Sequence, residues 1–207
     1  MTDKRTAKRS RIMDAATRRF SAHGYQQTRM ADIAADLEMK AGSLYYYFTS
    51  KESLLATIVE TNVGLATAAL EEIVVGEGRA IGKIRRAVES HLSVFAEQPD
   101  LYAIFLSEKL DAISPDLAAT ADNMGRRYER LWIDLIEAGA AAGDLRSDLD
   151  AWVTMKAVVG LCNSMLFWFS PGGSMKPSDL SDAFARLVLD GIALDGVVFD
   201  TLVDRTG

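Results

Sequence analysis

The sequence predicts an all-α protein, with a short N-terminal domain over residues 1–51 and a larger helical body over residues 52–207. Two observations predict this fold. Apolar residues recur three and four positions apart in one segment after another, as they do on one face of an α-helix. Glycine or proline separates these segments, and both residues are typical of helix ends. At 207 residues, with 49% hydrophobic and 25% charged residues, the chain is long enough to bury a core.

The first predicted helix covers residues 7–23, and Gly24 follows it as a left-handed cap. Its apolar stripe consists of Ile12, Ala15, Ala16 and Phe20. Residues 1–6 are predicted to be a disordered arm. The remaining predicted helices cover residues 28–37, 41–48, 52–75, 79–97, 100–110, 115–142, 150–169 and 179–194.

Residues 28–51 predict two short helices around a tight turn. The apolar positions of this stretch are Ile33, Ala34, Leu37, Met39, Leu44 and Phe48. The outward positions of its second helix are small or hydrogen-bonding, namely Ala41, Gly42, Ser43, Tyr45, Tyr46 and Tyr47. Small residues permit close approach to DNA, and hydroxyl groups reach phosphates and base edges. The pattern therefore predicts a helix that enters the major groove.

Hydrogen-bonding residues stand at the starts of the helices on either side. Thr28 is predicted to cap the helix that begins there, its side-chain oxygen accepting from a backbone N–H, and Thr49 or Ser50 to cap the long helix that follows. Helix N-termini also bind phosphates, so Thr28 and Arg29 are candidate contacts to the DNA backbone.

The charge of the chain is unevenly distributed. The whole chain has a net charge of −6, which alone would disfavour nucleic acid. Residues 1–51 hold ten lysines and arginines against five acidic residues, a net charge of +5, whereas the remainder holds 13 against 24, a net charge of −11. A basic head on an acidic body is expected if the head alone faces phosphate. A flexible basic tail on an acidic protein is the alternative.

These residues also carry a family resemblance. In order they are Thr28, Ile33-Ala34, Gly42-x-Leu44-Tyr45-x-Tyr47-Phe48 and Lys51-Glu52-x-Leu54-Leu55. Over roughly residues 8–56 the pattern resembles the DNA-binding domain of the TetR family of transcriptional regulators. The resemblance implies a homodimer with one three-helix helix-turn-helix domain per subunit and a C-terminal helical domain for ligand binding and dimerisation.

The chain departs from the family pattern at two positions. Glu38 stands where glycine is usual, so it is expected to adopt a left-handed backbone at a cost of about 1 kcal/mol. Lys40 stands where a serine or threonine usually opens the recognition helix.

The helix N-termini and the resemblance together give the predicted contacts to operator DNA. They are Thr28, Arg29, Lys40, Ala41, Gly42, Ser43, Tyr45, Tyr46, Tyr47 and Lys51. Positions matching Ala41–Ser43 face bases, those matching Tyr45–Tyr47 face phosphates or thymine methyl groups, and Lys51 meets a phosphate. One of the three tyrosines is expected to serve mainly in packing. Lys51 as a solvated residue is the alternative.

The body is expected to pair two copies and to bind a small molecule. Family members dimerise through their last two helices, and the corresponding segments here are both apolar. The helix over residues 52–75 links the two domains, so a shift of it would move the recognition helix. The aromatic and methionine residues of the body suit an apolar cavity, with a packed core as the alternative. Asn163, on the most apolar helix, either bonds a neighbouring helix or contacts a ligand.

The run from Leu145 to Gly173 weakly resembles family members that sense acyl-CoA thioesters in lipid and steroid catabolism. On that resemblance an acyl chain would lie among Phe95, Tyr102, Phe105, Tyr128, Trp132, Asn163 and Phe167. Arg126, Arg127 and Arg130 would form either a solvated, salt-bridging face or the mouth of an anionic-ligand site.

Motifs for other functions are not found. The chain has two histidines, His23 and His91, and one cysteine, Cys162. The sequence shows no nucleophile–base pair, no Cys/His spacing typical of a metal site and no phosphate-binding loop. Neither an enzyme nor a cofactor is therefore expected. One cysteine, no long uninterrupted apolar run and no signal peptide favour the cytoplasm. A DNA-bound scaffold that recruits a protein, without an effector, is the alternative function. The sequence leaves induction and corepression both open.

Overall fold

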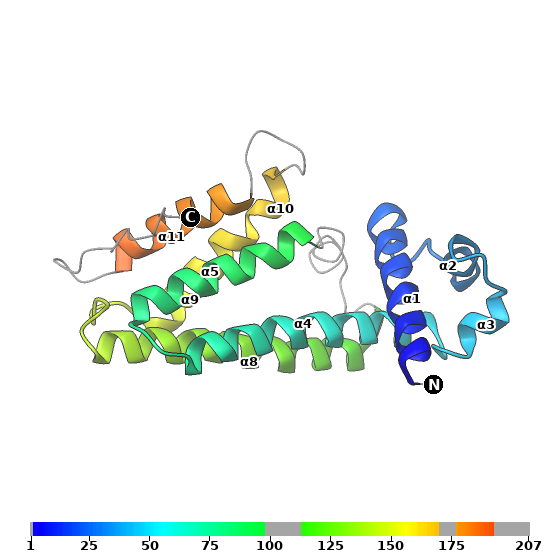
Figure 1. The fold of residues 1–207 in the computed structure, drawn as a ribbon, viewed down its shortest axis with the longest axis horizontal. Helices are drawn as coiled ribbons and strands as arrows, with labels where there is room; N and C mark the ends of the chain where they lie inside the picture. Colours follow the sequence, from blue (N-terminus) through cyan, green and yellow to red (C-terminus); the bar gives the residue numbers. More distant parts are fainter. Residues whose placement is uncertain (1, 98–112, 170–176, 193–207) are drawn as a thin grey trace. The chain divides into compact units, whose positions relative to one another are not determined.

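The computed structural model describes residues 2–97, 113–169 and 177–192, and these form helices and turns without a strand among them. The predicted all-α fold is confirmed (Figure 1). The helices are α1 (Thr2–His23), α2 (Met30–Asp36), α3 (Ala41–Tyr45), α4 (Lys51–Val75), α5 (Ala80–Glu97), α8 (Pro115–Ala141), α9 (Ala151–Asn163), α10 (Met165–Trp168) and α11 (Pro177–Ile192). The helix predicted over residues 100–110 lies outside the described residues.

The chain divides into two compact units, one of residues 1–68 and 94–128 and the other of residues 69–93 and 129–207. The divisions fall inside α4, α5 and α8, so each of these helices contributes residues to both units. The first unit holds the predicted DNA-binding domain, residues 1–51, which is called the head below. The second holds α9, α10, α11 and the remaining parts of the long helices.

The core of the first unit is built from the apolar stripes of α1, α2, α3 and the first turns of α4, together with Leu117 at the start of α8. Its buried members include Ile12, Ala16, Phe20, Ile33, Leu44, Phe48, Leu54, Leu55, Ile58 and Leu117. The α1 stripe and its cap are as predicted, because Gly24 has φ 78° and its N–H donates to the carbonyl of Phe20 at 2.9 Å. The arm prediction is wrong, since α1 already begins at Thr2.

Helix α4 is long and apolar enough to cross a membrane by length and composition alone. Its first turns, however, bury Leu54, Leu55, Ile58 and Val59 in the core of the first unit. Core helices share this composition, so it is weak evidence for a membrane span.

In the second unit, Asp144 ties the start of α5 to the turn after α8. Its carboxylate accepts from the Arg79 Nε–H at 2.9 Å and from the backbone N–H of Ala80 at 2.9 Å. The hydrogen bond from Arg79 holds the pKa of this carboxyl below its ordinary value. Gly139 lies beneath this turn, where a Cβ would come within 2.7 Å of the Cβ of Ala80.

One predicted helix is interrupted. A single helix was expected from residue 150 to residue 169, but α9 ends at Asn163 and α10 follows after Ser164. The hydroxyl of Ser164 donates to the carbonyl of Leu161 at 2.7 Å, a local bond that competes with regular helix geometry. The sequence offers Asp148 and Asp150 as caps for the start of this helix, and the cap is Asp150, whose carboxylate accepts from the N–H of Val153.

Asp144→Ala is expected to lower the free energy of unfolding by about 1–3 kcal/mol, because the buried N–H of Ala80 and the Arg79 guanidinium both lose their acceptor. Asp148→Ala is the matched control. Asp148 pairs with Arg146 on the surface, where water and salt screen the ion pair, so its loss should leave the free energy of unfolding nearly unchanged. Urea unfolding measures both, and equal losses would contradict the role assigned to Asp144.

Candidate nucleic-acid interface

Helix α3 presents a small, polar face to solvent. Leu44 is fully buried and Phe48 is 3% exposed, and these two side chains anchor the helix in the core of the first unit. Ala41, Gly42 and Ser43 are exposed, as are Tyr45 at 49% and Tyr46 at 70%. A Cβ built on Gly42 would meet no atom within 4 Å. The face predicted to enter the major groove is therefore open to a partner.

Tyr47 differs from its two neighbours. It is half-buried and packs against the core of the head. Its ring meets the ring of Tyr46 edge-on at a centroid distance of 5.3 Å. Among the three tyrosines it is the one whose surroundings fit the expected packing role.

Arginines of α1 hold the C-terminal end of α3. Arg9 Nη1–H donates to the carbonyl of Tyr47 at 2.8 Å, and its guanidinium lies 4.3 Å from the centre of the Phe48 ring. Arg5 lies 5.6 Å from the centre of the Tyr46 ring. A cation at a helix C-terminus also meets the negative end of the helix dipole. Sequence reasoning missed these contacts, since 38 residues separate Arg9 from Tyr47.

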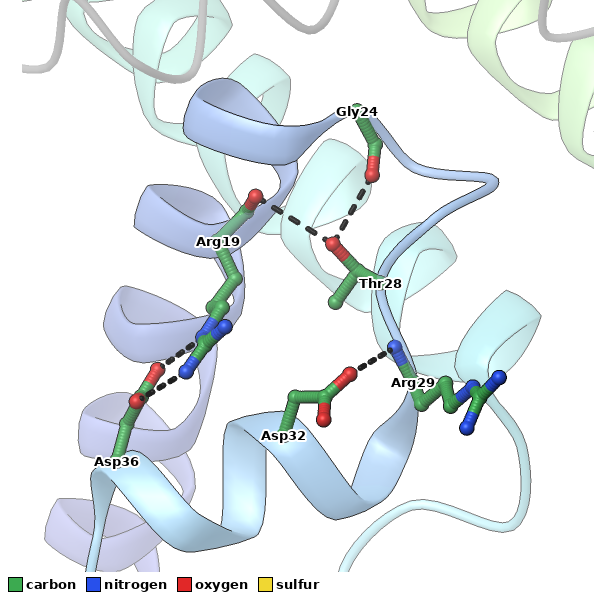
Figure 2. A network of polar contacts seen from close by, with 6 residues as sticks. All are labelled: Arg19, Gly24, Thr28, Arg29, Asp32 and Asp36. Carbon is green, nitrogen blue, oxygen red and sulfur yellow. Dashed lines mark hydrogen bonds and ion pairs between the residues drawn. The ribbon is translucent and has the colours of Figure 1, made fainter.

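The predicted cap at Thr28 is wrong. Figure 2 shows that the Thr28 hydroxyl points back to the end of α1, where it donates to the carbonyl of Gly24 at 2.9 Å and faces that of Arg19 at 3.4 Å. Its side chain is 2% exposed. The N-cap of α2 is Arg29, whose backbone N–H donates to the Asp32 carboxylate at 2.9 Å. Thr28 is therefore shielded from solvent, whereas the side chain of Arg29 is exposed at this helix start.

An ion pair joins α1 to the end of α2. Arg19 donates two hydrogen bonds to the Asp36 carboxylate, from Nε at 2.6 Å and from Nη2 at 2.7 Å (Figure 2). This paired geometry holds the pKa of Asp36 below its ordinary value. Arg19 is therefore used within the head.

The turn between α2 and α3 has the predicted strain. Glu38 has φ 53°, so the expected left-handed conformation is confirmed. The N–H of Glu38 donates to Ala35 and that of Met39 to Ala34, which ends α2. Lys40 is the N-cap of α3 without a side-chain cap bond, and its side chain is exposed. The following cap is Ser50 rather than Thr49, because Ser50 Oγ accepts from the N–H of Ser53 at 3.0 Å.

Lys51 is engaged inside the head. Its ammonium donates to the carbonyls of Tyr25 at 2.8 Å and Thr28 at 3.0 Å, and lies 3.5 Å from that of Gln26. It also lies 4.1 Å from the centre of the Tyr25 ring. Its phosphate contact stays a prediction that must compete with these acceptors.

The residues predicted to line a ligand site have varied surroundings. Trp132 is fully buried, Tyr128 is half-buried and Phe167 is 82% exposed. Asn163 bonds a neighbouring helix, because its Oδ1 lies 3.0 Å from Nε2 of His91 on α5. Tyr102 and Phe105 lie outside the described residues, as does the side chain of Phe95.

The arginine cluster of α8 is at least partly a salt-bridging surface. Arg130 pairs with Asp134 at 2.9 Å, and Arg126 lies 4.0 Å from Asp122. Each pair is one helical turn apart and exposed. For Arg126 and Arg130 these contacts favour the interpretation as a solvated, salt-bridging face.

Helices α9 and α11 form an apolar groove in the second unit. Its lining consists of Leu149, Val153, Thr154, Ala157, Val158, Leu161, Leu187, Val188, Gly191 and Ile192. Two large apolar side chains of this lining are exposed, Val153 at 55% and Leu187 at 66%. An exposed apolar surface is typical of a protein–protein contact.

Two family models match this chain. The model described as bacterial regulatory proteins, tetR family, matches residues 12–58, and the one described as tetracyclin repressor-like, C-terminal domain, matches residues 77–192. The chain belongs to the TetR family. Its members are transcriptional regulators, and its helix-turn-helix is the α2–α3 pair described above.

Relatives of this TetR-family chain extend over nearly its whole length. The HTH-type transcriptional repressor KstR2 of Rhodococcus jostii is 24% identical over 192 residues, covering 93% of this chain and 94% of that protein. The fatty acid metabolism regulator protein of Bacillus subtilis is 23% identical and covers 87% and 93%. The structure of the ketosteroid transcriptional regulator KstR2 of Mycobacterium tuberculosis superposes with a TM-score of 0.83 at 20% identity, covering 91% and 96%. That likeness shows the same fold.

Stability should depend on pH through His91. Burial lowers the pKa of His91 below 6.5, the ordinary value that it regains on unfolding. Between those two values the unfolded chain binds more protons, so stability rises with pH there and is lost as the pH falls below about 6.5. Urea unfolding between about pH 5 and pH 8 measures this slope.

The variant His91→Gln should flatten the slope, because it removes the titrating group while keeping an N–H donor for Asn163. His23→Gln, at an exposed position, is the control and should leave the slope as it is. A His91→Gln slope equal to that of the parent protein would contradict the assignment.

Proposed function

We propose that this chain is a ligand-responsive transcriptional repressor that binds a palindromic operator as a homodimer and is released by a small apolar or amphipathic effector. The observation that carries the proposal is the exposed face of α3, in which small and hydroxyl-bearing side chains surround a glycine with open space above it. It acts in the cytoplasm, where its DNA lies.

The DNA contacts divide into two kinds. Ala41, Gly42 and Ser43 read base edges, since small side chains let the helix backbone approach the groove floor. Tyr45 and Tyr46 contact phosphates or thymine methyl groups. The exposed cations Arg29 and Lys40, which stand at the starts of α2 and α3, supply phosphate contacts. Thr28 is buried and Tyr47 is half-buried, so these two residues hold the surface in place through packing and hydrogen bonds within the head.

The dimer forms through α9 and α11. Their exposed apolar side chains need a cover, and a second copy of the same groove would supply one in a two-fold contact. A two-fold dimer presents two α3 helices to half-sites spaced by about one helical turn, roughly 34–36 Å, or a multiple of it.

The names of relatives support a proposal for the effector class. Two of them are named for fatty acids or ketosteroids, and the structure of the regulator FadR from Bacillus subtilis was solved in complex with stearoyl-CoA. We propose an acyl-CoA thioester for this chain, consistent with the apolar composition of the body. Stabilisation by long-chain acyl-CoA in a thermal-shift screen, together with loss of operator binding, supports it. If no compound in the screen stabilises the protein or releases it from the operator, the alternative scaffold function is favoured.

Gly42→Leu is expected to weaken operator affinity at least tenfold without loss of stability. The new side chain meets open space in the free protein but would hold α3 away from the groove. Gly125→Leu is the matched control, because a Cβ at Gly125 on α8 also meets no atom within 4 Å. Fluorescence anisotropy with the upstream DNA of the gene measures both, and unchanged binding by Gly42→Leu would refute the assigned interface.

Leu187→Asp is expected to give a monomer, since it places a charge in the apolar groove of α9 and α11. Leu65→Asp is the control, because Leu65 is 64% exposed on α4 and lies in the first unit. Analytical ultracentrifugation measures the oligomeric state of both variants, and the Leu65→Asp protein should remain a dimer. A Leu187→Asp protein that stays dimeric would place the interface elsewhere.

A further inference from the structure

The N-terminal turns of α1 carry two arginines in line with its buried stripe. Ile12, Ala16 and Phe20 belong to that stripe and are at most 2% exposed. Arg9 and Arg5 continue it toward the N-terminus, at the same spacing of three and four residues. Arg9 is half-buried and Arg5 is exposed, so the stripe leaves the core of the head at these two residues.

Both arginines lie beside the C-terminal end of α3, close to the N-terminal end of α1 (Figure 1). Arg9 Nη1–H donates to the carbonyl of Tyr47 at 2.8 Å. Arg5 instead lies over the ring of Tyr46, with its guanidinium carbon 5.6 Å from the ring centre. Tyr46 is 70% exposed and belongs to the surface assigned to operator DNA. Arg5 therefore lies at the edge of that surface.

The guanidinium of Arg5 keeps its N–H groups available to a partner. A guanidinium has five N–H donors and no acceptor. Across residues 2–97, 113–169 and 177–192, no carbonyl or carboxylate accepts a hydrogen bond from Arg5, whose partner there is the Tyr46 ring. An arginine over an aromatic face still presents its N–H groups to a phosphate oxygen. Arg19, by contrast, already donates two hydrogen bonds to Asp36.

We propose that Arg5 binds a phosphate of the operator, outside the stretch of residues 28–51 that forms the helix-turn-helix. The Tyr46 ring restricts the position of the long side chain, so less conformational freedom is lost when the guanidinium binds. The first turns of α1 thereby extend the operator-binding surface beyond the C-terminal end of α3. The inference rests on the proposed function, since it adds one contact to that surface.

The salt dependence of operator binding measures this contact. Each phosphate contact adds about 0.9 to the magnitude of the slope of log affinity against log salt concentration, hence about 1.8 for the two subunits of a dimer. Arg5→Gln removes the charge, so its slope should be smaller by about 1.8, with at least a fivefold loss of affinity at low salt. Its melting temperature should stay close to that of the parent protein, because Arg5 is exposed.

Arg11→Gln is the matched control. Arg11 is an exposed arginine of the same helix, and a residue two positions from Arg9 lies on the other side of α1. The substitution makes the same change in net charge as Arg5→Gln but lies away from α3. Its slope and affinity should therefore stay close to those of the parent protein.

Phosphate ethylation locates the contact on the DNA, because it neutralises single phosphates of the operator. One phosphate in each half-site should interfere with binding of the parent protein and of Arg11→Gln when it is ethylated, and should not interfere with binding of Arg5→Gln. Identical interference patterns for the three proteins would overturn the proposal.

Two outcomes of the salt measurement also overturn it. An Arg5→Gln slope equal to that of the parent protein would show that Arg5 meets no phosphate. An Arg11→Gln slope reduced as much as that of Arg5→Gln would show an effect of overall charge. In both cases the parent protein still binds its operator, so the proposed function stands. A parent protein that binds no operator would refute the proposed function, and this inference with it.

Discussion

The burial of Leu44 and Phe48 is the contact on which the rest of the head depends. Helix α3 has five residues, far below the length at which an isolated helix is stable in water. It exists because these two side chains are inserted into the core formed by α1, α2 and α4. With both anchors pointing inward, the other side chains of α3 are left on the surface. The same packing thus forms the helix and exposes the face that meets DNA.

Much of the positive charge of the head stabilises the head itself. Arg9 binds the carbonyl of Tyr47, Arg19 binds Asp36 and Lys51 binds the turn before α2. These side chains join α1, α2, α3 and α4 by polar bonds outside the apolar core. The net charge of +5 is therefore a poor count of phosphate contacts, and exposed cations such as Arg29 and Lys40 are better candidates.

Local patterns were predictable, and contacts between distant residues were not. The helical stripes and the left-handed Gly24 depend on nearby residues and were predicted correctly, and the left-handed Glu38 was expected from the family resemblance. The direction of the Thr28 hydroxyl depends on how α1 approaches α2. The bond between His91 and Asn163 spans 72 positions, and periodicity carries no information on it. The break at Ser164 arises from one hydroxyl that the apolar pattern conceals.

The placement of α3 in the major groove can be measured directly, because burial raises the pKa of the single thiol, Cys162, to about 12 and leaves it unreactive. Ser43→Cys then carries the accessible thiol, to which an iron chelate that cleaves DNA is attached. The account predicts two clusters of operator cleavage about one helical turn or a multiple apart. The control carries the same reagent on Glu89→Cys, an exposed position of the body. The account would be contradicted if the Ser43→Cys protein cleaved no operator DNA, or if its cleavage pattern matched that of the control.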